Sequence, residues 1–330
     1  MFHFLSRTSD QSVDPDKHAP ADSKPAGPSI GLVLGGGAAR GFAHIGIIRT
    51  LIAKGFTPDI ITGTSIGAVV GGCYAAGKLD DIEAWSRSLT RRGLLSYLDV
   101  SFGGSGLING AKLTEKITGG IGDLSIEQLP IRYAAIATEI GTGHEIWITR
   151  GRLAEAMRAS YALPGIFPPV RLGERWLVDG ALVNPVPVSV ARALGARIVI
   201  AVNVNTDLFG RGTAVPDQGE ASPPEPPIEE EVVSRGLFSL FSTEKSAKRH
   251  ILGTESRPGL STVMVEAFNI MQDRITRARL AGDPPDLLIS PRVGRIGLFD
   301  FHRAEDAISL GAEAAERALE GFEELVAALA

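Results

Sequence analysis

Cysteine is almost absent from this sequence. Only Cys73 occurs among 330 residues, which excludes an intramolecular disulfide. Cys73 lies in an apolar, helix-like stretch, where a lone thiol is expected to pack as a small core residue. Hydrophobic residues make up 44% of the chain, enough for a sizeable core.

Long uninterrupted hydrophobic runs are also missing. The most continuous one, residues 60–76, is shorter than the roughly 20 residues of a membrane span. Glycines interrupt it at Gly63, Gly67, Gly71 and Gly72. The apolar residues 1–5 are far too few for the core of a signal peptide. We therefore expect a cytoplasmic protein.

No sign of charge dominates. The 33 Lys and Arg and 38 Asp and Glu residues are mixed along the chain and give a net charge of −5. A nucleic-acid partner would need basic residues clustered on one face, so none is predicted. The six histidines show no metal-ligand spacing, and we expect no metal and no other cofactor.

Composition divides the chain into a body and two unusual segments. Residues 1–28 are polar without apolar periodicity and predict a disordered tail, followed by a single domain over residues 29–330. Residues 205–258 are rich in Pro, Gly, Ser and Glu and predict a largely disordered insert in that domain. The apolar residues 237–241 within it, followed by three basic residues, have two interpretations: transient contact with a membrane surface, or packing on the body.

The body alternates strands and helices. Residues 29–34 predict a buried strand, residues 42–54 a helix, residues 57–64 a second strand and residues 66–76 a second helix. Further strands are expected at residues 131–140, 144–149, 175–178, 197–203 and 286–290, the first two as a hairpin. Further helices are expected at residues 80–92, 111–117, 153–161, 186–194, 262–280 and 304–329, with a loop near the site over 94–108.

The most informative stretch surrounds Ser65. Gly63 and Gly67 flank it at two positions on either side, the G-x-S-x-G spacing of a nucleophile elbow. Such a serine occupies a strained turn between a strand and a helix, and a side chain at either glycine would crowd the neighbouring backbone. The alternative is an ordinary turn before a helix.

A glycine loop follows the first strand. A glycine loop at a helix N-terminus directs several N–H groups to one point and suits an anion. The G-x-G-x-x-G pattern of dinucleotide sites and the G-K-[ST] of a P-loop are both absent. Two interpretations remain: an oxyanion hole made by the amides of Gly36, Gly37 and Ala38, with Arg40 as anchor or added charge, or a tight structural turn.

A carboxylate ends another predicted strand. Asp179 is followed by Gly180 and Ala181, which places it well to project into a site. The alternative is an ordinary Asp-Gly turn. Residues 162–170, just before that strand, are apolar and turn-rich, and fit either an acyl-chain channel or a buried loop.

Together, the three motifs resemble the patatin-like phospholipase family, in particular its small bacterial members. The resemblance is dense over residues 29–205 and looser beyond. The family pattern Gly-Gly-Gly-x-Lys/Arg-Gly is nearly met by residues 36–41, with Ala38 where glycine is usual. Alanine keeps its N–H, so the donor is retained if φ at Ala38 is negative. The nucleophile position of the family falls on Ser65 and its aspartate position on Asp179.

The resemblance implies a three-layer α/β/α sandwich with a central, mostly parallel sheet. It also implies hydrolysis of a phospholipid, lysophospholipid or other acyl ester by a Ser65–Asp179 dyad that needs no histidine. Three alternatives stay open from the sequence. They are a Ser-Asp-His triad that uses His250 or His302, acyl transfer to an acceptor other than water, and a non-catalytic lipid-binding or regulatory module on the same fold.

Overall fold

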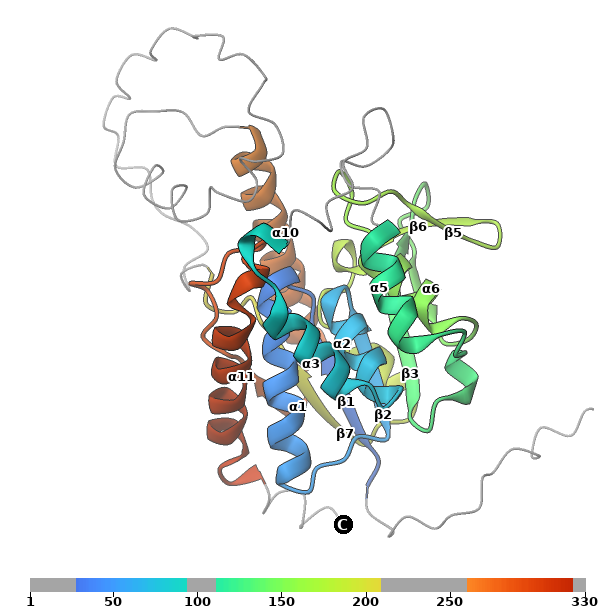
Figure 1. The fold of residues 1–330 in the computed structure, drawn as a ribbon. Coiled ribbons are helices and arrows are strands. Elements are labelled where there is room, and N and C mark those ends of the chain that lie inside the picture. Colours follow the sequence, from blue (N-terminus) through green and yellow to red (C-terminus); the bar gives the residue numbers. More distant parts are fainter. Residues whose placement is uncertain (1–27, 94–110, 209–259, 323–330) are drawn as a thin grey trace, which may run out of the picture.

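A computed structural model describes residues 28–93, 111–208 and 260–322 (Figure 1). The predicted tail (residues 1–28) therefore lies outside the described residues, except for its last position. The loop expected at 94–108, most of the insert (209–258) and the apolar residues 237–241 lie outside them as well. Among the described residues, no helix combines the length and the apolar character that crossing a lipid bilayer requires.

A mostly parallel sheet forms the centre of the fold. Its strands run in the order β5-β6-β3-β2-β1-β7-β8, and β4 pairs with β3 as well. Strands β3, β2, β1, β7 and β8 are parallel neighbours, whereas β4 and β6 run antiparallel to β3. The strands are β1 (Ile30–Leu34), β2 (Ile60–Thr64), β3 (Arg132–Glu139), β4 (Glu145–Ile148), β5 (Val170–Leu172), β6 (Arg175–Asp179), β7 (Ile198–Val202) and β8 (Leu287–Ile289).

Helices cover both faces of this sheet. They are α1 (Ala43–Ala53), α2 (Ile66–Ala75), α3 (Leu79–Ser88), α5 (Ala111–Ile121), α6 (Leu153–Ser160), α7 (Val188–Ala193), α10 (Leu260–Gly282) and α11 (Ala304–Leu319), with short 3₁₀ turns η1 (Ala38–Phe42), η2 (Ile126–Gln128), η3 (Gly180–Leu182) and η4 (Phe301–Arg303).

Alternation along β1 explains the layers. Leu32 and Leu34 enter a large core with α1, α2 and α11, whereas Val33 enters a second core with α7 on the opposite face. A strand buried on both faces reads as a continuous apolar run, as β1 and β7 do. The predicted three-layer α/β/α sandwich with a mostly parallel sheet is confirmed.

The predicted elements are present, with differences in several boundaries. Val170 was expected to end the apolar segment 162–170, but it begins β5, which pairs with β6 and forms a hairpin. α3 ends at Ser88, before the expected residue 92, and α5 continues to Ile121, beyond residue 117. Residues 323–329 of the helix expected at 304–329 lie outside the described chain, and α11 itself ends at Leu319.

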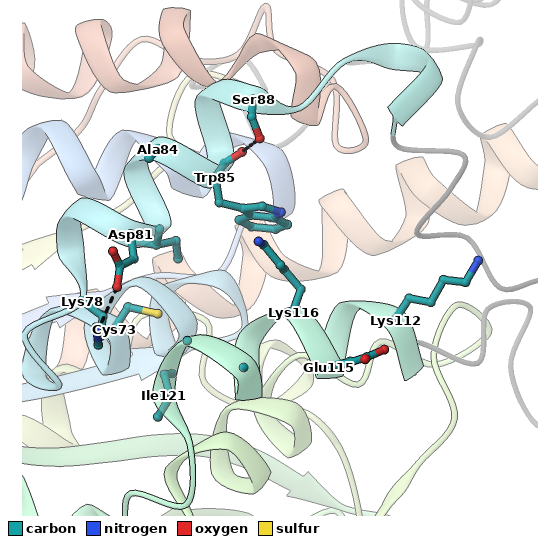
Figure 2. Close-up of a pocket in the computed structure, with 13 residues that line it drawn as sticks. Cys73, Lys78, Asp81, Ala84, Trp85, Ser88, Lys112, Glu115, Lys116 and Ile121 are labelled. Atoms are coloured by element: carbon teal, nitrogen blue, oxygen red, sulfur yellow. Dashed lines mark hydrogen bonds and ion pairs between the residues drawn. The ribbon is translucent and has the colours of Figure 1, made fainter.

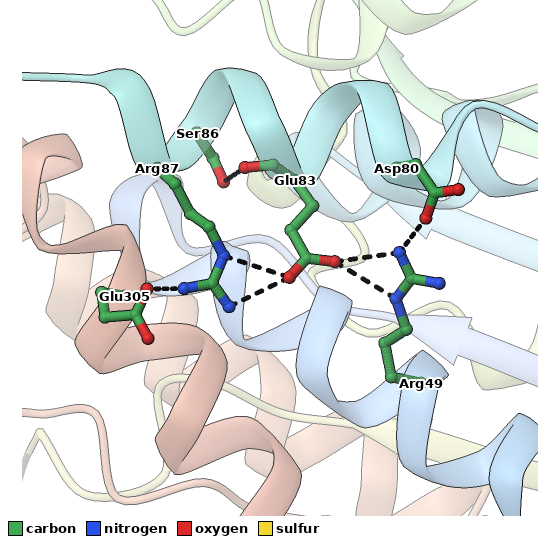
Figure 3. Close-up of polar contacts among 6 residues, drawn as sticks. All are labelled: Arg49, Asp80, Glu83, Ser86, Arg87 and Glu305. Carbon is green, nitrogen blue, oxygen red and sulfur yellow. Dashed lines mark hydrogen bonds and ion pairs between the residues drawn. The ribbon is translucent and has the colours of Figure 1, made fainter.

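Charged side chains connect three helices on one face (Figure 3). The carboxylate of Glu83 on α3 accepts from Arg49 on α1 at 3.0 Å and from Arg87 at 3.0 Å. Arg87 also pairs with Glu305 on α11, and Arg49 with Asp80. Because most of these side chains are solvent-exposed, the network orients the helices more than it stabilises them.

Candidate active site

Ser65 occupies the turn between β2 and α2, in the strand-turn-helix context that a nucleophile elbow requires. Its φ of 56° and ψ of −124° are a strained conformation for a residue with a side chain. The flanking glycines allow this turn. A Cβ added at Gly67 would lie 2.1 Å from the Leu34 carbonyl oxygen, and one added at Gly63 would lie 2.5 Å from the Ala68 nitrogen.

Strand register brings Asp179 to this serine. In β3, Ile136 pairs with Thr64 at the end of β2, and the next residue, Ala137, pairs with Asp179 at the end of β6. The ends of β2 and β6 therefore meet at adjacent positions of β3. The Ser65 hydroxyl donates to Asp179 Oδ2 at 2.7 Å. The other oxygen, Oδ1, accepts from the Ala181 N–H at 2.8 Å.

The Asp179 carboxyl is removed from solvent, with 2% of the residue exposed. Burial raises its pKa to about 6, against the opposing effect of the hydrogen bonds from Ser65 and Ala181. A carboxylate with such a pKa is a stronger base than an ordinary aspartate and is still ionised at neutral pH. This combination suits a group that removes a proton from a hydroxyl.

Two further hydroxyls fix the dyad. Ser160, fully buried on α6, accepts from the Ser65 N–H at 2.8 Å and donates to the Ile136 carbonyl at 2.6 Å. Thr138 donates to the Asp179 carbonyl at 2.9 Å. Neither role was predicted from the sequence, although Ser160 lies in the stretch that resembles the patatin-like family. A short polar side chain in the buried face of a helix was the available signal.

The glycine loop lies beside the elbow. A Cβ built on Gly36 would be 3.5 Å from the Ser65 Cβ and 3.5 Å from the Ala181 Cβ. The Gly36 N–H, however, donates to the Pro185 carbonyl at 3.0 Å. This corrects the prediction that Gly36 supplies an oxyanion donor, because its N–H already has an acceptor. Within the described part of the chain, the N–H groups of Gly37 and Ala38 have no hydrogen-bond acceptor.

The condition stated for Ala38, a negative φ, is not met. Its φ is 46°, a left-handed conformation that disfavours any residue with a Cβ. The chain reverses here between the extended Gly37 and the turn η1 that begins at Ala38. The Ala38 N–H nevertheless has no acceptor among the described residues, so it stays available as a donor, and the positive φ adds strain to the loop.

Ala38→Gly is expected to stabilise the protein by up to about 1 kcal/mol, because glycine adopts positive φ without the steric cost. Hydrolytic activity should be retained, since the N–H stays in place. Urea denaturation of both proteins measures the difference. A clear loss of stability in the glycine variant would contradict the strain assigned to Ala38.

Arg40 anchors the glycine loop from behind. It is buried, with 1% of the residue exposed. Its Nε donates to the Ile296 carbonyl at 2.8 Å, and its guanidinium donates to the side-chain oxygens of Asn205 at 3.2 Å and Asn269 at 3.4 Å. Asn205 in turn donates to the Gly36 carbonyl at 2.9 Å. Arg40 thus fits the anchoring interpretation, and Asn205 is a supporting residue that the sequence did not indicate.

The described histidines are His44, His144 and His302, and none of them is hydrogen-bonded to Ser65 or Asp179. His44 is fully buried, and its Nε2 donates to the Gly35 carbonyl at 2.8 Å. Burial lowers its pKa to about 4, so the ring is neutral. His302 lies in η4, where its Nε2 accepts from Arg91 at 3.0 Å.

A cavity of about 1020 Å³ lies between α3 and α5, away from this chemistry (Figure 2). Trp85, Lys116 and Ile121 are among its lining residues, and the Lys78–Asp81 ion pair lies at one side. The lining contains neither member of the dyad and no residue of the glycine loop. Among the described residues, no group of three or more His, Cys, Asp and Glu side chains is placed to hold a metal ion.

Comparison with known proteins agrees with this geometry. A family profile described as patatin-like phospholipase matches residues 32–192, from β1 to α7. An uncharacterized NTE family protein of Mycobacterium tuberculosis is 34% identical over 342 residues, which cover 90% of this chain and 92% of that protein. The chain belongs to the patatin-like phospholipase family.

Two further matches are either more partial or less similar in sequence. Patatin-like phospholipase domain-containing protein 7 of Rattus norvegicus is 36% identical over 200 residues, which cover 57% of this chain and 15% of that protein. Among solved structures, VipD from Legionella pneumophila matches with a TM-score of 0.43 and 13% identity, over 91% of this chain and 68% of that chain.

Proposed function

We propose that this protein is a lipid acyl hydrolase that works through a Ser65–Asp179 dyad and an acyl-enzyme. The observation that carries the proposal is the 2.7 Å hydrogen bond from the Ser65 hydroxyl, held in a strained elbow, to a buried carboxylate. A nucleophile and a base within hydrogen-bond reach are the minimum that acyl transfer requires.

The reaction follows from these positions. Ser65 Oγ attacks the ester carbonyl carbon while Asp179 Oδ2 accepts the hydroxyl proton. The tetrahedral oxyanion then lies against the N–H groups of Gly37 and Ala38, each worth roughly 3–4 kcal/mol in comparable hydrolases. Collapse breaks the ester C–O bond, and the departing alcohol takes the proton from Asp179. Water then attacks the acyl-enzyme, gives its proton to Asp179, and Ser65 leaves with that proton as the free acid is released.

A lipid substrate is supported by the surroundings of the dyad as well as by the family. The Asp179 N–H donates to the Ala162 carbonyl at 2.9 Å, which ties the base to the apolar residues 162–170. In that segment Phe167 stacks edge-on against Tyr161, with ring centroids 5.4 Å apart. An apolar wall next to the nucleophile suits an acyl chain. We therefore favour phospholipids and lysophospholipids over short polar esters.

A lipid panel tests the proposal. The full chain is incubated with a phospholipid, a lysophospholipid and a monoacylglycerol in the presence of EDTA, and free fatty acid is quantified. Release from at least one of them is expected, because the dyad supplies base and nucleophile without an added metal. Adding glycerol as an acceptor separates hydrolysis from acyl transfer. No product from any lipid, together with no labelling of Ser65 by a fluorophosphonate, would support a non-catalytic module instead.

His302→Ala is expected to retain at least about half of the hydrolytic rate, because the dyad already contains its base. Burial and the nearby positive charge of Arg91 lower the pKa of His302 below its ordinary value, against the opposing effect of Asp300. Steady-state hydrolysis of a p-nitrophenyl ester measures the effect. Complete loss of activity in a folded His302→Ala protein would revive the Ser-Asp-His triad.

A further inference from the structure

Helix α10 is amphipathic, but it turns a polar face toward the body and an apolar face toward solvent. Four of its side chains are polar and buried, each at most 5% exposed: Asn269, Gln272, Asp273 and Thr276. Four large apolar side chains face outward, each at least 46% exposed: Val263, Met264, Ile270 and Met271. A helix on the surface of a globular protein normally buries its apolar stripe and exposes its polar one. The outward apolar face of α10 therefore has no role in the core.

The polar inner face of α10 has a clear structural purpose. Asn269 accepts from Arg40 at 3.4 Å, and Gln272 accepts from the Asn205 side chain at 3.0 Å. Asn205 supports the Gly36 carbonyl, so α10 holds the glycine loop in place. The inner face belongs to the catalytic scaffold, and this leaves only the outer face unexplained.

The outer face forms a continuous stripe, defined here as Val263, Met264, Ala267, Ile270 and Met271. These positions recur at spacings of three and four residues, one helical turn apart. The stripe ends at Arg274, an exposed residue three positions after Met271. An apolar stripe bounded by arginine is the arrangement of a helix that dips into a lipid interface while its cation stays with the headgroups.

The stripe lies at the edge of the molecule that holds the dyad. Figure 1 shows α10 and the β5–β6 hairpin at the same end of the fold, with the ends of the central strands between them. A Cβ built on Gly165 would be 3.9 Å from Met264 Cε, so the stripe borders the apolar residues 162–170. A lipid that enters at this edge would therefore meet the stripe before it reaches Ser65.

The hairpin across this edge presents a second apolar and cationic group. Trp176 is 52% exposed and pairs across the strands with Arg171. Ile140, 49% exposed, donates its N–H to the Trp176 carbonyl at 2.9 Å. Tryptophan beside arginine is typical of the water–lipid boundary, where the indole ring and the guanidinium both find partners.

We propose that the α10 stripe and the Ile140–Trp176 group together dock the protein on a lipid surface with anionic headgroups, with the dyad facing that surface. The inference rests on the proposed lipid hydrolase function. Charge selects the partner, because Arg274 and Arg171 border the two apolar groups and would lie at headgroup level. A second copy of the chain or another protein would not need cations at both boundaries.

Vesicle sedimentation tests the docking face. The full chain with Ser65→Ala is mixed with vesicles of phosphatidylcholine and phosphatidylglycerol, so that binding is measured without turnover. The triple variant Met264→Gln, Ile270→Gln and Met271→Gln, and separately Trp176→Ser, should bind at least about tenfold more weakly. Ile52→Gln is the matched control. Ile52 is also an exposed apolar residue, but it ends α1 at the opposite end of the sheet.

The same substitutions in the enzyme with Ser65 separate docking from chemistry. Hydrolysis of a soluble p-nitrophenyl butyrate should stay within about twofold of the parent, while hydrolysis of vesicle lipid falls with binding. Equal vesicle binding by parent and variants, or no binding by the parent, would overturn the proposal. So would a dimer that the stripe substitutions dissociate without a change in vesicle binding. Absence of soluble ester hydrolysis in the parent would count against the hydrolase function alone, because vesicle binding is measured independently.

Discussion

Ser65→Ala is expected to reduce ester hydrolysis roughly 10⁴-fold or more, the effect typical of removing the nucleophile of a serine hydrolase. The substitution removes the atom proposed to form the acyl-enzyme, the Oγ that lies 2.7 Å from Asp179 Oδ2. The strained turn survives, because alanine places a Cβ at the same position. Labelling by a fluorophosphonate probe should be lost together with activity.

Ser88→Ala is the matched control for that experiment. Ser88 is an exposed serine at the end of α3 whose hydroxyl donates to the Trp85 carbonyl. Its removal should leave both activity and labelling unchanged. If Ser65→Ala keeps more than about one hundredth of the parent rate, the proposal that an acyl-enzyme forms on Ser65 is wrong.

Asp179→Asn is expected to lower hydrolysis by at least roughly 10³-fold, because an amide cannot accept the serine proton. The geometry should be preserved. The asparagine oxygen can accept from the Ala181 N–H, and its NH₂ group can donate to the Ser65 hydroxyl. Asp81→Asn, at an exposed aspartate paired with Lys78, is the control and should leave the rate unchanged.

The same variant should be more stable than the parent at pH 8. Burial raises the folded-state pKa of Asp179 from 3.8 to about 6, so the folded protein holds this proton more tightly than the unfolded chain. The free energy of unfolding therefore falls as pH rises between these two values, and the loss persists above them. Asparagine avoids that loss, which is worth about 3 kcal/mol. Urea denaturation should show the gain at pH 8 and none near pH 4. If Asp179→Asn and the parent were equally stable at both pH values, burial of the ionised Asp179 carboxylate would not cost stability as stated here.

The sequence predicted the parts of the site but not how they meet. Each motif was expected at a strand end, and the glycine loop and Ser65 were each expected between a strand and a helix. Asp179 lies 114 positions beyond Ser65. Asp179 reaches Ser65 because β6 runs antiparallel to β3 and pairs with it from Ala137 onward, directly after the residue of β3 that pairs with the end of β2. Strand direction and register of that kind leave no local pattern in the chain.

Main-chain hydrogen bonds and torsion angles were the second feature that could not be predicted from the sequence. The acceptor of the Gly36 N–H is a backbone carbonyl, that of Pro185, and every residue carries such a group. The positive φ of Ala38 is likewise set by the loop around it and not by alanine itself. Helix α10 shows the same limit. Its helical character was predictable, but the polar face turns inward because Arg40 and Asn205, far away in sequence, need its side chains.

The rate of fluorophosphonate labelling of Ser65 as a function of pH tests whether Asp179 is the base, because it reports activation of the nucleophile apart from binding and product release. The rate is expected to rise through a single ionisation with a midpoint near the pKa of about 6 of Asp179, and then to stay level above it. In Asp179→Asn, labelling should be slow and show no such transition. An Asp179→Asn protein that labels as fast as the parent, with the same midpoint, would show that Asp179 is not the base.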